Sequence, residues 1–151
     1  MTMKFTHEKL NDVLPEMKAL LDDHYEELTL NKDKVKLNPI WDTYLKLENN
    51  NEFYLLTARD DGVLVGYSAF FMKPHIHYAD VIVASNDVLY LKKEYRLGMT
   101  CVKLLKFSEQ KMKEFGATKV TWHVKESNDF RPILHRMGYM DEDIIVGKIL
   151  C

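Results

Sequence analysis

Cysteine is scarce in this sequence. The 151 residues contain only two, Cys101 and Cys151, and they lie far apart in the chain. Neither belongs to a Cys-x-x-Cys pair or to the dense cysteine pattern of a small secreted domain, so we expect no disulfide framework. This cysteine usage fits a reducing compartment and predicts a cytoplasmic protein.

Long apolar runs and a surplus of one charge are also missing. No stretch approaches the roughly 20 apolar residues of a membrane span, and residues 1–5 contain no apolar signal region. The formal net charge is −2, which gives no electrostatic argument for nucleic-acid binding. We therefore expect neither a membrane nor a nucleic-acid partner.

Proline and glycine are few, with 4 and 6 residues, and they form no linker or repeat. Hydrophobic residues make up 46% of the chain, enough for one sizeable core at this length. We therefore expect a single domain over residues 1–151.

Hydrophobic periodicity predicts an alternation of strands and helices. The order β-α-α-β-β-β-α-β-α-β indicates an α+β fold, a mixed sheet with helices on both faces. The predicted elements are strands at 3–6, 53–58, 63–72, 79–91 and 120–124, helices at 10–28, 39–47, 100–115 and 128–137, and a last strand or hairpin at 139–151.

Several residues predict where these elements begin, turn and end. Asp12 is a candidate cap for the first helix, and Asp61-Gly62 between two apolar runs predicts a hairpin. Gly116 and Gly138 are candidates for the positions just after two helices. The odd-numbered residues of 79–91 share one face if no bulge interrupts that strand.

The stretch 86–116 reads as a strand, a short polar turn and a long helix. This order brings free backbone N–H groups and the positive end of a helix dipole to one spot, which can hold an anion such as a phosphate. Gly98 would allow close approach of the backbone, and Arg96 would add a cationic donor. The alternative is an ordinary strand–helix unit with a surface arginine.

Together with the order of elements, three segments resemble the GNAT superfamily of acyl-CoA-dependent N-acyltransferases. They are residues 87–96 (DVLYLKKEYR), 61–66 (DGVLVG) and 136–139 (RMGY). The resemblance covers nearly the whole chain and is strongest to short, phage- or prophage-type members. It implies a mostly antiparallel mixed sheet with a V-shaped splay between the fourth and fifth strands.

The resemblance also implies acetyl-CoA as the acyl donor, with no metal. In the family, pantetheine lies in the splay against strand backbone, and the pyrophosphate lies on the turn into the central helix. The residues that match these positions are Leu89, Tyr90 and Leu91 for pantetheine, Arg96, Leu97, Gly98, Met99 and Thr100 for the pyrophosphate, and Asn128 as a further contact.

The chain departs from the family pattern at two places. The usual pyrophosphate motif is Arg/Gln-x-x-Gly-x-Gly/Ala, and Arg96-Leu97-Gly98 is one residue shorter if Arg96 is the first motif residue. If Tyr95 takes that place, the spacing fits, but Tyr95 and Thr100 replace the usual residues. Many members also carry a tyrosine acid in the last helix, where this chain has Leu134. His135 is the nearest titratable group, although it leaves the helix about 100° away.

Candidates for the base and the acceptor pocket come from three regions. Asp87 lies where many members carry a carboxylate base, although it could equally be a hydrogen-bonded residue at a strand end. The substrate candidates are Tyr25 and Glu26 at the end of the first helix, and His77 and Tyr78 after a strand. His75 and His77 form an i, i+2 pair, but no further ligand accompanies them, so we expect no metal site.

Two functions follow from these residues. The first is transfer of an acetyl group from acetyl-CoA to an amine of a small molecule, or to a protein lysine or N-terminus. The second is a catalytically weak module of the same fold that acts by binding a protein or CoA. A homodimer is one assembly that the sequence leaves open.

Overall fold

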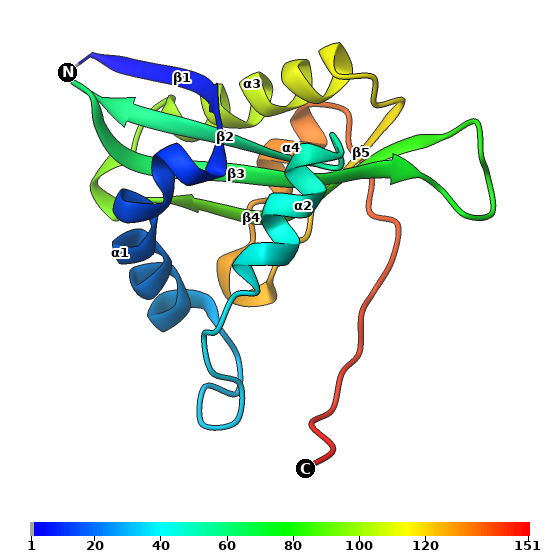
Figure 1. Ribbon diagram of the computed structural model, residues 1–151, viewed down its shortest axis with the longest axis horizontal. Coiled ribbons are helices and arrows are strands. Elements are labelled where there is room, and N and C mark those ends of the chain that lie inside the picture. Colours follow the sequence, from blue (N-terminus) through cyan, green and yellow to red (C-terminus); the bar gives the residue numbers. More distant parts are fainter. Residues whose placement is uncertain (1) are drawn as a thin grey trace.

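The computed structural model describes residues 2–151, which fold around one five-stranded sheet (Figure 1). In chain order the elements are β1 (Met3–Glu8), α1 (Leu10–Leu28), α2 (Trp41–Asn49), β2 (Phe53–Asp60), β3 (Val63–Pro74), β4 (Ile82–Leu91), α3 (Thr100–Glu114), β5 (Lys119–Thr121) and α4 (Arg131–Arg136). One-turn 3₁₀ helices lie at Lys93–Tyr95 and Glu126–Asn128. No helix among these residues is long and apolar enough to cross a bilayer.

The strands follow the order β1-β2-β3-β4-β5, and all neighbours are antiparallel except β4 and β5. The β2–β3 hairpin turns at Asp61-Gly62, where φ is +47° and +85°, as the sequence predicts. The parallel pair is short, because it runs only from Val83 opposite Lys119 to Ser85 opposite Thr121. Beyond Ser85 the rest of β4 has no partner on β5. The V-shaped opening expected between the fourth and fifth strands is thereby confirmed.

A β-bulge interrupts β4 at Asp87. Val88 lies opposite Ala69 and Asn86 lies opposite Phe70, so Asp87 has no partner on β3. The amide of the buried Asn86 side chain donates to the carbonyls of Ala69 (3.1 Å) and Val88 (3.0 Å). These two bonds hold the bulge in a fixed shape.

The bulge changes which residues of β4 share a face. Ala84 packs into the core on the α3 side, together with Met112. Tyr90 is also even-numbered, yet it packs into the core on the opposite side, against α1. The single face expected for every second residue of 79–91 depended on an uninterrupted strand, and the bulge ends that alternation because it inserts one residue.

Helices cover both faces of the sheet, as predicted. The helices α1 and α2 pack over one face, around Phe53, Leu55 and Tyr67. The helix α3 packs over the other face through a buried stripe that includes Leu104, Leu105 and Met112. Figure 1 shows α1 and α2 on one side of the strands and α3 on the other.

The helix ends agree with the sequence in two cases and differ in one. Gly116 and Gly138 follow α3 and α4, as predicted. Their φ angles are +109° and +97°, positive values that glycine adopts readily at the end of a helix. The expected cap of α1 by Asp12 is wrong. The buried Glu48 of α2 accepts the N–H of Leu10 with both carboxylate oxygens, at 3.0 and 3.3 Å.

The strand or hairpin predicted at the end of the chain is also absent. Residues 139–151 follow α4 without regular secondary structure. Glu142 still forms an ion pair with Lys119 of β5, and the chain beyond it runs away from the sheet (Figure 1). A strand needs a neighbour for its backbone groups, and this segment pairs with none of the described residues. Its apolar sequence therefore predicted a strand without revealing a partner.

Candidate functional site

The turn between β4 and α3 carries a set of unpaired backbone donors. Within residues 2–151, the N–H groups of residues 97–102 have no hydrogen-bond acceptor, and no side chain caps α3. Gly98 has a φ of +83°, and the space over its α-carbon is open. Leu97 and Met99 on either side of it are exposed. This turn has the donors and the dipole end that anion binding requires.

Arg96 points away from those N–H groups, back toward α1. Its Nε donates to the carbonyl of Leu91 at 2.6 Å, and both Nη atoms contact the carboxylate of Glu27. The guanidinium also lies 5.4 Å from the ring centroid of Tyr90. The hydrogen bond from Arg96 lowers the pKa of the Glu27 carboxyl. Arg96 thus ties the end of β4 to α1, and it would have to leave or share Glu27 to reach a phosphate.

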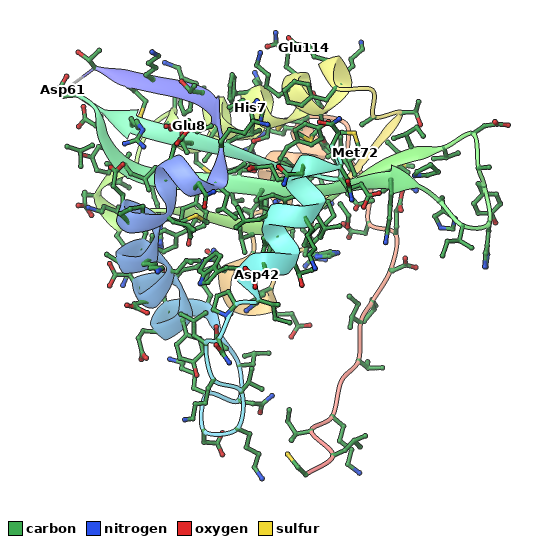
Figure 2. All side chains as sticks on the ribbon, viewed as in Figure 1. His7, Glu8, Asp42, Asp61, Met72 and Glu114 are labelled. Carbon is green, nitrogen blue, oxygen red and sulfur yellow. The ribbon has the colours of Figure 1, made fainter. Side chains whose placement is uncertain are left out.

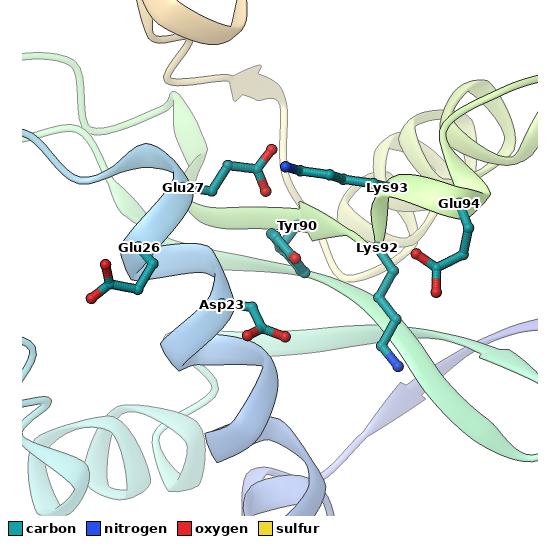
Figure 3. Close-up of a pocket in the computed structure, with 7 residues that line it drawn as sticks. All are labelled: Asp23, Glu26, Glu27, Tyr90, Lys92, Lys93 and Glu94. Carbon is teal, nitrogen blue, oxygen red and sulfur yellow. The ribbon is translucent and has the colours of Figure 1, made fainter.

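A cavity of about 540 Å³ opens beside this turn (Figure 3). One wall is acidic and the other contains two lysines. The lining residues are Asp23, Glu26 and Glu27 from α1, Tyr90 from β4, and Lys92, Lys93 and Glu94 from the turn. Figure 3 shows Glu27 and Lys93 directed toward each other above Tyr90. The walls can receive a cation on the α1 side and an anion on the turn side.

Of the first two predicted substrate residues, Tyr25 and Glu26, only one contacts this cavity. Glu26 lines it, whereas Tyr25 does not. The Tyr25 hydroxyl donates to the carbonyls of Lys32, at 3.1 Å, and of Val35, at 2.5 Å. Tyr25 therefore holds the segment that joins α1 to α2.

Asp87 lies in the bulge of β4, three residues before Tyr90, which lines the cavity. The hydroxyl of Tyr44 donates to Oδ2 of Asp87 at 2.8 Å, while Oδ1 has no donor within the described residues. Burial raises the pKa of the Asp87 carboxyl, and the hydrogen bond from Tyr44 and the charge of His123 oppose that rise. A half-buried carboxylate with one free oxygen and a raised pKa is suited to accepting a proton.

A second, small cavity of about 40 Å³ touches Asp87, with room for one or two water molecules. Its other walls come from α1, the link to α2, α2, β2 and β4, and they are mostly apolar. They include Tyr44, Trp41 and Val88. Tyr44 is a functional candidate that the sequence analysis missed, because nothing in the predicted helix 39–47 set it apart from a packing residue.

Two histidines lie near these groups in different ways. His24 accepts or donates through Nδ1 to the hydroxyl of the buried Tyr67 at 3.0 Å and stacks on Tyr90. Burial lowers the pKa of His24 to about 4, so its ring is neutral at pH 7 and acts as a packed residue. The exposed His123 follows β5, and its charge lowers the pKa of Asp87. No sequence signal singled out His123, because its partner lies 36 positions earlier.

The last helix presents an apolar residue to the interior. Leu134 is buried, whereas His135 is exposed and its Nε2 lies 2.7 Å from Oδ1 of Asp141. Asn128 is exposed in the 3₁₀ turn before α4, where its N–H donates to the carbonyl of Lys125. His135 and Leu134 thus point in different directions, and the structure gives His135 a carboxylate partner of its own.

The other predicted substrate residues lie far from the cavity. His77 and Tyr78 belong to the β3–β4 turn, at the opposite end of β4 from Tyr90. The ten residues of β4 span about 30 Å. His77 donates its N–H to Nδ1 of His75, and residues 2–151 contain no cluster of three or more histidine, cysteine or acidic residues that could hold a metal.

Comparison with known proteins gives the following matches. Residues 14–139 match the model of the acetyltransferase (GNAT) family. No curated protein matches the chain. Among solved structures, a ribosomal-protein-alanine N-acetyltransferase from Brucella melitensis biovar Abortus 2308 superposes with a TM-score of 0.72 at 19% identity over 99% of both chains.

Two further structures have similar scores. An aminoglycoside acetyltransferase from an uncultured soil metagenomic sample, in complex with sisomicin, has a TM-score of 0.74 at 18% identity, over 99% of this chain and 97% of the other. A predicted acetyltransferase with acetyl-CoA from Clostridium acetobutylicum has a TM-score of 0.70 at 15% identity, with the same coverage. At these identities the likeness establishes the common fold.

Proposed function

Because the chain belongs to the acetyltransferase (GNAT) family, we propose that it transfers an acetyl group from acetyl-CoA to an amine. The observation that carries this proposal is the parting of β4 from β5 after Ser85. Unpaired N–H groups lie at one end of the opened strand, and Asp87 lies on it. Asp87 and Leu91 are about 13 Å apart along the strand, which separates a phosphate-binding end from a proton-accepting end.

The residues of the chain fit the donor. Acetyl-CoA supplies the acetyl group as an activated thioester. The N–H groups of residues 97–102 would hold its phosphates, and the edge of β4 around Leu89–Leu91, which has no partner on β5, would bind the pantetheine through backbone. Gly98 leaves open space for close approach. Lys92 and Lys93 add positive charge beside this turn.

The acidic wall on α1 favours an acceptor that carries positive charge. Asp23, Glu26 and Glu27 line that wall, so a cationic amine would be attracted to it. A similar solved structure is an aminoglycoside acetyltransferase in complex with sisomicin. We therefore infer a small polyamine or amino sugar as the acceptor, in preference to a protein lysine or N-terminus.

Asp87 is the group that would take the proton from the attacking amine. An amine attacks only in its neutral form, so the ammonium must lose a proton nearby. The free Oδ1 of Asp87 can accept it directly or through a water molecule in the adjoining cavity. Tyr44 fixes the orientation of the carboxylate.

A second function has its own support. Leu134 cannot donate a proton, and Arg96 is held by Glu27 instead of facing the unpaired N–H groups. Both features favour a module of the same fold that binds CoA or a protein without efficient transfer. Measurements of acetyl-CoA binding and of acetyl transfer distinguish the two functions.

The experiment that tests the proposal combines a thermal shift with an assay of free thiol release. Acetyl-CoA at 100 times its dissociation constant should stabilise the protein by about 2.7 kcal/mol. Acetate alone serves as the control ligand. Release of CoA thiol that requires a polyamine or an aminoglycoside supports the enzyme. Stabilisation without release over a broad amine panel supports a module that binds CoA. The absence of any shift contradicts both the enzyme and the CoA-binding module.

A further inference from the structure

The carboxylate of Glu27 takes part in two arrangements at once. Both of its oxygens accept from the guanidinium of Arg96, with 2.8 Å between Oε2 and Nη2. The same side chain lines the cavity beside the turn, on the acidic wall where a cationic acceptor is proposed to bind. Figure 3 shows it directed across the cavity above Tyr90. One carboxylate therefore contacts the arginine expected at the donor site and also lines the site proposed for the acceptor.

While Glu27 holds it, Arg96 also occupies a backbone group that the donor would use. Its Nε donates to the carbonyl of Leu91 at 2.6 Å, and Leu91 belongs to the stretch of β4 proposed for pantetheine. The side chains of Arg96 and Glu27 are only 30% and 19% exposed, so water screens their attraction in part. The ion pair thus keeps both the guanidinium and the Leu91 carbonyl from the donor.

Neither substrate alone would leave the charges around Glu27 matched. If Arg96 turned to a phosphate by itself, a largely buried carboxylate would lose its ion-pair partner, and this is costly. Lys93 also faces Glu27 and lowers its pKa, but no ion pair joins the two within residues 2–151. If an ammonium reached Glu27 by itself, it would share one carboxylate with a guanidinium of the same charge. With both substrates bound, each cation has an anion of its own.

We propose that Glu27 couples the binding of the acceptor to the binding of the donor. A cationic acceptor replaces the guanidinium on Glu27, and Arg96 turns to the phosphates at the unpaired N–H groups of residues 97–102. The same turn frees the Leu91 carbonyl for pantetheine. Each substrate then strengthens the binding of the other by the same factor. This coupling rests on the proposed transfer function, and Glu27 is a positioning residue in it, because it acts on the donor through Arg96.

A second arginine, Arg59, provides a contrast to Arg96. Arg59 contacts two carboxylates, Glu8 and Glu16, and neither of them lines the cavity. Loss of one carboxylate would leave Arg59 with the other. Within the described residues Arg96 has a single carboxylate partner, and it directly precedes the unpaired N–H groups of residues 97–102. One competing cation on that carboxylate therefore suffices to release Arg96, and only its side chain has to turn.

The affinity for CoA, measured with and without an amine, tests the coupling. CoA carries the phosphates of acetyl-CoA without the acetyl group, so calorimetry records binding at equilibrium and no transfer occurs. An excess of spermidine or of sisomicin should raise the affinity of the wild type for CoA by about 5–150-fold, the range typical of coupled sites. Sodium chloride at the same ionic strength is the control for screening by the added cation.

Three variants assign the coupling to Glu27. Glu27→Gln should bind CoA tightly without an amine and gain less than about twofold from one, because Arg96 is already free. Glu26→Gln removes a charge from the same wall without touching Arg96, so it should weaken amine binding and keep the coupling factor. Glu16→Gln breaks the contact of another α1 carboxylate with Arg59 and should keep the factor as well. A Glu27 that only positioned the turn would change the CoA affinity equally with and without the amine.

Two results would overturn the coupling in a protein that binds CoA. One is a CoA affinity that neither amine changes, and this result counts even if acetyl transfer is observed. The other is a coupling factor that survives Glu27→Gln, since direct binding of the amine to CoA or another side chain would then cause it. Failure of the proposed function gives a different pattern. Coupling without acetyl transfer to either amine would reject the enzyme and keep the exchange at Glu27, whereas a protein that binds no CoA would reject both.

Discussion

Arg96 and Glu27 join the end of β4 to α1 across 69 positions of sequence, with both Nη atoms of the arginine on one carboxylate. The same guanidinium is the group expected to bind phosphate. The Glu27 carboxylate and a bound phosphate would therefore compete for the guanidinium of Arg96. The pair restrains the turn before α3 and limits what Arg96 can do for a ligand.

This competition leads to the first prediction. Arg96→Ala should weaken acetyl-CoA binding by about tenfold to a hundredfold, as expected for loss of a charge-assisted bond worth about 1.5–3 kcal/mol. Glu27→Gln should strengthen binding, because it frees the guanidinium. Calorimetry on both variants measures the two effects. An equal loss in both would mean that the pair only positions the turn.

The second prediction concerns the base. Asp87→Asn should lower kcat by about 10²–10⁴-fold with little change in acetyl-CoA affinity. Asp42→Asn, an exposed carboxylate on the same helix as Tyr44 (labelled in Figure 2), is the control and should retain full activity. Full activity in Asp87→Asn at neutral pH would remove Asp87 from the reaction.

The pH dependence of the rate tests the role of Asp87 as the base independently. A base acts only when ionised, and burial raises the pKa of the Asp87 carboxyl above the usual range of an aspartate. The rate should therefore fall as pH decreases through this raised pKa, and the Asn variant should lack that acidic limb. The Tyr44 hydrogen bond lowers the pKa of Asp87, so Tyr44→Phe should move the limb to higher pH.

The third prediction concerns the acid that many relatives carry. His135 is exposed and paired with Asp141, away from the buried Leu134. We therefore expect His135→Ala to reduce kcat by less than about tenfold, well below the usual range for a general acid. Asp141→Asn is the matched variant and should behave alike. A hundredfold loss in His135→Ala with normal acetyl-CoA affinity would identify His135 as the acid.

The fourth prediction concerns the start of α1. Glu48→Ala should lower the free energy of unfolding by about 2 kcal/mol, because it leaves the N–H of Leu10 buried without an acceptor. Asp12→Ala should cost less than about 1 kcal/mol, since Asp12 interacts only with the helix dipole. Urea unfolding compares the two variants. Equal losses would restore Asp12 as the cap.

The sequence determined the local structure well. Periodicity located the long helices and the antiparallel strands, and glycine placed the ends of α3 and α4, because these features depend on residues within a few positions of one another. The motif of residues 87–96 and its neighbours indicated the family. The order strand, turn and helix in residues 86–116 predicted the turn with unpaired N–H groups before α3.

The tertiary structure decided what depends on distant residues. The bulge at Asp87 reflects pairing with β3, and the cap of α1 comes from Glu48, 38 positions away. The partners of Arg96 and Asp87 lie 69 and 43 positions away, so no local pattern could reveal them. The terminal segment shows the same limit, because its side chains predict a strand, while only a neighbouring edge can supply the hydrogen bonds that make one.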